Sequence, residues 1–82
     1  MVYIVYILES EVDHSFYIGY TSDIERRLRE HNEGRSRYTS KKRPWRLYYF
    51  EEYKLKIDAI RRERFLKRQR NRDFYLSLGD RY

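Results

Sequence analysis

The sequence contains no cysteine and only two histidines. Without cysteine, neither a disulfide framework nor a thiolate zinc site can form, and two isolated histidines do not make a metal cluster. No apolar stretch approaches the roughly 20 residues that a membrane-spanning helix needs. The N-terminus also lacks the basic leader of a secretory signal peptide. We therefore expect a cytoplasmic protein that makes no membrane contact and is stabilised by its hydrophobic core alone.

A chain of 82 residues has room for one hydrophobic core, and a domain of this size buries only about 60% of the surface that its unfolded chain exposes. No internal repeat, low-complexity segment or linker divides the sequence, so we predict a single domain over residues 1–82. The 19 lysines and arginines against 13 aspartates and glutamates give a formal net charge of +6, which favours a polyanionic partner. Many small basic proteins are simply soluble, so the placement of the charge matters more than its sum.

Three stretches are rich in the β-branched and aromatic residues that are typical of strands: residues 2–8, 16–20 and 46–53. The first two should pair as antiparallel strands through a loose, polar hairpin loop at 9–15. Residues 35–46 carry six basic side chains and no acidic one. This pattern predicts an exposed basic loop before the third strand.

A capping-box pattern precedes the first predicted helix. In it, the Ser22 hydroxyl and the Glu25 carboxylate would bind the free N–H groups at the helix start. The helix should cover residues 23–32, and Gly34 is the flexible residue that commonly follows a helix C-terminus.

The C-terminal third returns to a helical period from about residue 55 to residue 69. Residues 73–78 could form a short final helix, and the chain from Gly79 onward reads as a tail. The order is strand, strand, helix, strand, helix, with a possible short C-terminal helix, and the fold class is α/β of the α+β type.

Two polar residues share the packing face of the first helix. At about 100° per residue, Arg27 and His31 fall in the same arc as Ile24 and Leu28. In one interpretation Arg27 reaches the rim and His31 is a satisfied edge residue. In the other, the pair is aimed into one cleft, where the guanidinium would bind phosphate oxygens and the imidazole would anchor or move a proton.

A carboxylate lies in the apolar face of the second long helix. Glu63 falls between Ile60 on one side and Leu66 on the other. It could form an ion pair with Lys67, four residues later. Alternatively it could bind Mg²⁺, which commonly accepts one or two carboxylates and keeps several waters.

Period-two alternation puts Tyr6 on one side of the first strand, and Tyr17 with Gly19 on one side of the second. If these sides coincide, two phenols face one another across the sheet. Tyrosine is common in sheets for packing reasons alone, whereas a glycine within a strand often marks close approach of another group.

The order of these residues resembles the GIY-YIG nuclease superfamily. It consists of Tyr6 in the first strand, Tyr17-Ile18-Gly19 in the second, Arg27 and His31 on the next helix, and then Glu63. The chain is most similar to the small stand-alone bacterial members of unassigned function. The similar segments are YIGYT at 17–21, ERRL at 25–28, EHN at 30–32 and AIRRE at 59–63.

The resemblance implies a role for each residue. Tyr6 and Tyr17 would be the motif tyrosines, Arg27 would stabilise the phosphate, His31 would be its helix partner and Glu63 would bind Mg²⁺ or Mn²⁺. One phenol, which we leave open, would accept a proton from a water that attacks the phosphodiester. The resemblance also implies a small three-stranded antiparallel sheet flanked by helices. Many members carry a further distal asparagine, and we do not assign Asn71 to that role.

The implied partner is nucleic acid, DNA more than RNA. Residues 61–72 contain seven basic side chains, which with the loop at 35–46 could contact the phosphate backbone or form a solvated surface. Sequence preference should be weak or supplied by a partner protein, and the oligomeric state is open. A nucleic-acid-binding module without turnover, or a protein-interaction domain, would fit the same charges.

Overall fold

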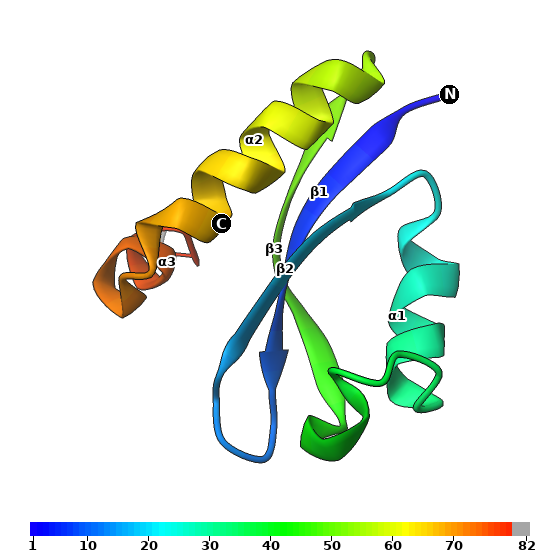
Figure 1. The fold of residues 1–82 in the computed structure, drawn as a ribbon, viewed down its shortest axis with the longest axis vertical. Helices are drawn as coiled ribbons and strands as arrows, with labels where there is room; N and C mark the ends of the chain where they lie inside the picture. The colour runs from blue at the N-terminus through cyan, green and yellow to red at the C-terminus, as the bar shows by residue number, and fades with distance from the viewer. Residues whose placement is uncertain (80–82) are drawn as a thin grey trace.

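The structure, a computed structural model that describes residues 1–79, is a three-stranded antiparallel sheet with helices on both faces (Figure 1). Its elements in chain order are β1 (Tyr3–Ser10), β2 (Phe16–Thr21), α1 (Ile24–Asn32), the 3-10 turn η1 (Ser40–Lys42), β3 (Trp45–Tyr53), α2 (Lys56–Gln69) and α3 (Arg72–Gly79). The strand order is β2-β1-β3, so β1 is central. The predicted α+β fold is confirmed. Residues 80–82 of the predicted tail lie outside the described residues.

Each face of the sheet is apolar because each is covered by helices. Alternate residues of β1 point to opposite faces, so Val5 and Ile7 pack beneath α2 and α3, while Tyr6 and Leu8 pack beneath α1. Figure 1 shows α1 on one side of the sheet and α2 with α3 on the other. As a result β1 is buried from Val5 to Ser10, and β2 and β3 form the two edges of the sheet.

The start of α1 differs by one residue from the capping-box prediction. Asp23 is the N-cap, and its carboxylate accepts the Arg26 N–H at 3.1 Å, whereas Ser22 is exposed. The assignment of Ser22 was therefore wrong. Asp caps as well as Ser and also places a negative charge at the positive end of the helix dipole. At the other end Gly34 has φ +81°, the left-handed conformation expected of a residue just past a helix.

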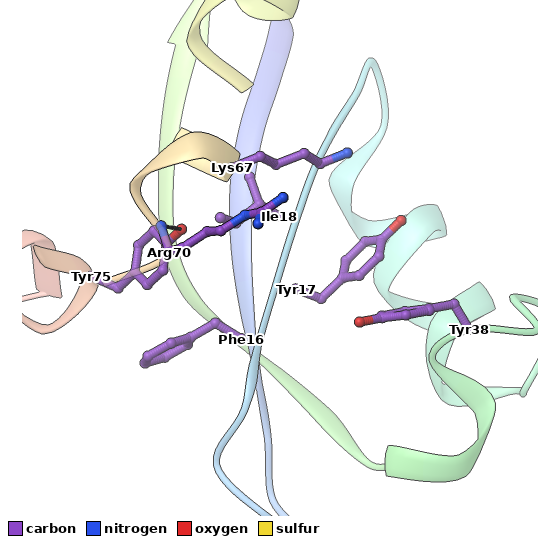
Figure 2. Close-up of a pocket in the computed structure, with 7 residues that line it drawn as sticks. All are labelled: Phe16, Tyr17, Ile18, Tyr38, Lys67, Arg70 and Tyr75. Carbon is purple, nitrogen blue, oxygen red and sulfur yellow. Dashed lines mark hydrogen bonds between the residues drawn. The ribbon is translucent and has the colours of Figure 1, made fainter. Parts of the chain in front are cut away.

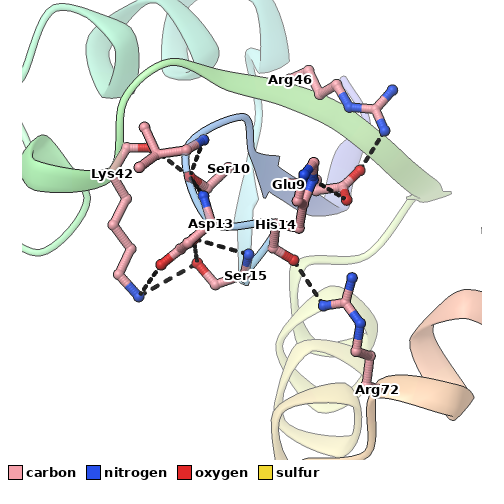
Figure 3. A network of polar contacts seen from close by, with 9 residues as sticks. Glu9, Ser10, Asp13, His14, Ser15, Lys42, Arg46 and Arg72 are labelled. Atoms are coloured by element: carbon pink, nitrogen blue, oxygen red, sulfur yellow. Dashed lines mark hydrogen bonds and ion pairs between the residues drawn. The ribbon is translucent and has the colours of Figure 1, made fainter.

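The hairpin between β1 and β2 is held by a polar network (Figure 3). The strand β1 runs two residues beyond the predicted end at residue 8, because Glu9 and Ser10 also pair with β3 and are buried. Ser10 Oγ donates to the Lys42 carbonyl at 2.7 Å, and Glu9 pairs with Arg46. From α3, Arg72 donates to the His14 carbonyl at 2.8 Å. The hairpin is thus bonded to η1 and β3 through Lys42 and Arg46, and to α3 through Arg72.

A second ionic cluster fixes α2 on the sheet. Arg62 of α2 binds both carboxylate oxygens of Glu51 on β3, at 2.8 and 3.0 Å, and the Tyr53 hydroxyl donates to the same carboxylate at 2.6 Å. The Tyr49 hydroxyl also donates to it. Burial alone would raise the pKa of Glu51, but hydrogen bonds led by that from Arg62 lower it. Because Arg62 is held, the position of its neighbour Glu63 is set as well.

Candidate functional site

The two predicted tyrosines lie on the same face of the sheet, under α1. Leu8 of β1 pairs with Tyr17 of β2, and Tyr6 pairs with Gly19. The ring centroids of Tyr6 and Tyr17 are 6.4 Å apart. A Cβ atom at Gly19 would be 2.6 Å from the Tyr6 hydroxyl oxygen, closer than real Cβ contacts come. Gly19 is therefore required because the Tyr6 phenol lies directly across its backbone.

Tyr6 and His31 are both fully buried and are joined by a hydrogen bond between Oη and Nε2 of 3.2 Å. The second ring nitrogen of His31, Nδ1, lies 2.8 Å from Thr39 Oγ1, which in turn donates to the Ser36 carbonyl at 3.4 Å. Since Thr39 has one hydroxyl proton, it accepts from His31 Nδ1–H. His31 Nε2 then carries no proton and accepts a hydrogen bond from the Tyr6 hydroxyl.

The ionisation states follow from burial. Desolvation, assisted by the nearby Arg27 charge, lowers the pKa of His31 to about 4, so the ring is neutral at pH 7. Desolvation also raises the pKa of Tyr6 to about 12, although a hydrogen bond from Arg27 acts in the opposite direction. Tyr6 therefore stays protonated, and its O–H donates a hydrogen bond to His31 Nε2.

Arg27 of α1 is half-buried beside these rings. Its guanidinium pairs with Glu30 at 3.1 Å and lies near enough to the Tyr6 phenol to oppose the rise in the pKa of Tyr6 that burial causes. One chain of hydrogen bonds thus runs from Tyr6 through His31 to Thr39, and the Arg27 guanidinium, paired with Glu30, lies beside its phenol end.

Glu63 approaches from the opposite layer. Its side chain is only 15% exposed and pairs with Lys67 at 3.5 Å. Its charge is close enough to contribute to the raised pKa of Tyr6. Within residues 1–79 no group of three histidine, cysteine, aspartate or glutamate side chains could hold a metal ion. Glu63 would supply one carboxylate, and a single carboxylate fits Mg²⁺ when water and substrate phosphate supply its remaining ligands.

An open groove of about 550 Å³ follows the outer edge of β2 next to this cluster. Figure 2 shows Tyr17 and Tyr38 on its α1 side, and Lys67, Arg70 and Tyr75 on its other side. Tyr17 thus belongs to both the buried cluster and the groove. It is the half-buried one of the two tyrosines and the one that a solvent molecule can reach.

Two contacts of the candidate site were not predicted from the sequence. The loop at 35–46 is largely exposed, as its charge predicted, but Thr39 within it is buried against His31. The loop is held there by Asn32, whose side chain exchanges two hydrogen bonds with the Trp45 backbone, at 2.6 and 3.0 Å. Trp45 Nε1 then donates to the Thr39 carbonyl at 2.9 Å. Hydrophobic periodicity could not single out Thr39, because it lies in a loop. The sequence signal for this contact was indirect: Asn32, which holds the loop, directly follows His31 in the EHN segment.

Asn71, which was not assigned, lies outside the cluster. Its side chain accepts the N–H of Asp73 at 2.9 Å at the start of α3. That hydrogen bond is a helix cap, so the structure gives Asn71 a structural contact.

Among the described residues, no helix is long and apolar enough to cross a membrane.

Comparisons with known proteins give a family, relatives and a structure of similar fold. A family model described as the GIY-YIG catalytic domain matches residues 2–75. UPF0213 protein lin0209 of Listeria innocua is 40% identical over 75 residues, which are 88% of this chain and 82% of that protein. UPF0213 protein HQ_3675A of Haloquadratum walsbyi is 45% identical over 64 residues, 77% of this chain and 71% of that protein. The solution structure of UPF0213 protein BH0048 from Bacillus halodurans, 36% identical, superimposes with a TM-score of 0.60 and covers 98% of this chain and 84% of that one.

Proposed function

Because the chain belongs to the GIY-YIG catalytic domain family, we propose that it is a metal-dependent endonuclease that hydrolyses phosphodiester bonds in DNA. The observation that carries the proposal is the convergence of Tyr6, Tyr17, Arg27 and His31 on one face of the sheet, with the Glu63 charge acting on the same phenol. The nucleases of this family generally use divalent metals. A cation held by Glu63 would neutralise charge on the scissile phosphate.

The protein side chains divide the work according to exposure. Arg27 would bind the non-bridging oxygens of the phosphate, because its guanidinium is half-buried, charged and paired with Glu30 beside the Tyr6 phenol. Tyr17 would contact the attacking water, because its phenol lines the groove. Tyr6 is buried and protonated, so it is a positioning residue that links Arg27 to His31.

The decisive assay is nicking of supercoiled DNA with Mg²⁺ or Mn²⁺. Glu63→Ala should abolish cleavage, and Arg27→Ala should reduce it by about 10²–10³-fold, the usual effect of losing one stabilising donor. Two matched controls remove the same charges elsewhere. Glu52 is exposed on β3, at the opposite edge of the sheet, and Arg29 is exposed on α1; their alanine variants should cleave at the wild-type rate.

Cleavage that survived both Glu63→Ala and Arg27→Ala unchanged would refute this assignment and indicate a contaminating nuclease. The alternative function is a nucleic-acid-binding module on the same scaffold. The observation that favours it is the positive charge of Lys67 and Arg70, which line the groove. It predicts salt-sensitive DNA binding without metal-dependent cleavage of any substrate in a panel of duplexes, flaps and single strands.

A further inference from the structure

The groove along β2 carries an aromatic surface that leads outward from the buried cluster. The His31 and Tyr17 ring centroids are 4.9 Å apart, and those of Tyr17 and Tyr38 are 5.9 Å apart with an interplanar angle of 41°. Exposure rises along this series from the fully buried His31 to Tyr38, which is 74% exposed. The outermost ring therefore offers a face to solvent directly beside the site of the proposed reaction.

The facing wall of the groove is basic. Lys67 and Arg70 line it together with Tyr75. Arg70 ends α2 in the left-handed conformation, with φ 45°, where glycine is the usual residue and costs nothing in strain. The Tyr75 hydroxyl accepts the Arg70 N–H at 3.2 Å and donates to the Leu66 carbonyl at 2.6 Å. A strained position that is held in place and still carries an arginine points to a use for that side chain at the groove.

An aromatic wall opposite a basic wall matches the two halves of one nucleotide. A base can stack on a phenol while its phosphate contacts the lysine and arginine. The groove volume of about 550 Å³ lies within the roughly 300–1,000 Å³ that is typical of small-ligand sites. In a duplex both faces of a base are covered by the neighbouring pairs, so only an unpaired nucleotide can present a free face to Tyr38.

We propose that the groove along β2 binds an unpaired DNA nucleotide next to the scissile phosphate, with its base on Tyr38 and its phosphate between Lys67 and Arg70. The substrate class is then DNA with a single-stranded segment. This inference rests on the proposed function, because it takes the neighbouring cluster as the place of cleavage. Stacking and phosphate contacts are tolerant of sequence, so the groove should show little base preference.

The test is binding of fluorescently labelled oligo(dT) and of a duplex of the same length, measured by anisotropy in EDTA so that no cleavage occurs. The wild type should bind the single strand more tightly than the duplex. Tyr38→Ala should weaken single-strand binding by about 5- to 150-fold, the range for loss of one base-stacking ring. Tyr38→Phe, which keeps the ring, should bind as the wild type does.

Arg70 provides a second, fold-neutral test. Arg70→Gly removes the side chain and relieves the left-handed strain, so it should fold at least as well and bind the single strand less tightly. Arg68→Ala removes one positive charge from an exposed position of the same helix that does not line the groove, and should have a smaller effect. Equal losses in these two variants would indicate general charge attraction and refute a specific phosphate contact.

The outcomes separate the two proposals. Equal affinity of wild type and Tyr38→Ala for the single strand, or equal affinity of the wild type for single strand and duplex, overturns the groove assignment even where Glu63-dependent cleavage is found. Ring-dependent binding of the single strand without metal-dependent cleavage supports the groove and overturns the nuclease assignment.

Discussion

Thr39 provides the sharpest test of the buried hydrogen-bond chain. Thr39→Val keeps the shape of the side chain and removes its hydroxyl, so His31 Nδ1–H loses the acceptor that lies 2.8 Å away. Both residues are fully buried, so water cannot replace the lost partner without a local rearrangement. Leaving one buried polar group unsatisfied costs about 1–3 kcal/mol. In a domain of this size each kcal/mol lowers the melting temperature by about 4–8 °C.

The substitution also predicts a change of tautomer. With no acceptor at Nδ1, the His31 proton should move to Nε2, which would then donate to Tyr6 Oη. The Tyr6 O–H would lose its acceptor in that case, because the Arg27 guanidinium carries only donors, so one buried polar group stays unsatisfied with either tautomer. Denaturant unfolding measures the loss of stability, and ¹⁵N chemical shifts of the histidine rings report the tautomer. Thr39→Ser keeps the hydroxyl and should retain the wild-type tautomer. Full stability of Thr39→Val with unchanged ring shifts would refute the chain as described.

Two further predictions concern the same rings. Gly19→Ala should cost about 1–3 kcal/mol, the usual penalty for overpacking a core, because the new Cβ would lie 2.6 Å from the Tyr6 hydroxyl oxygen; thermal unfolding measures it, and a melting temperature equal to that of the wild type would contradict the close approach. The pKa of His31 is lowered from 6.5 to about 4, so the unfolded chain binds a proton there more readily and stability should fall, by up to about 1.4 kcal/mol per unit, as the pH drops from 6.5 to 4. Unfolding curves of the wild type and His31→Asn over that interval isolate this contribution, and parallel curves would show that His31 does not titrate as described.

The sequence was sufficient for the fold because its signals are local. The strand-like composition and the two helical periods placed each element to within a few residues. One error occurs where a tertiary contact decides, since β1 extends beyond residue 8 because Glu9 and Ser10 find partners on β3. The other is a local choice between two adjacent residues that can both cap a helix, of which Asp23 and not Ser22 is the N-cap of α1.

The site was predictable in part for the same reason. Periodicity singled out Arg27, His31 and Glu63 as polar residues on apolar faces. The register that pairs Tyr6 with Gly19 could not be derived from the sequence, and neither could the contact of Thr39 with His31, which joins a loop to a helix. The catalytic and metal-binding roles of the five residues stay predictions until the variants are assayed.

The buried chain also bears on the choice between an enzyme and a binding module. A surface that only binds nucleic acid needs exposed positive charge, and Lys67 and Arg70 already provide it at the groove. Burying His31, Tyr6 and Thr39 adds little stability that well-packed apolar side chains of the same shape could not supply. What the polar residues provide and apolar ones cannot is a fixed set of hydrogen bonds beside the Arg27 guanidinium, which itself pairs with Glu30. A fixed donor is useful where charge develops during a reaction, because it needs no reorganisation at that moment. This difference favours turnover over simple binding, and it is why cleavage by Arg27 and Glu63 variants is the more informative measurement.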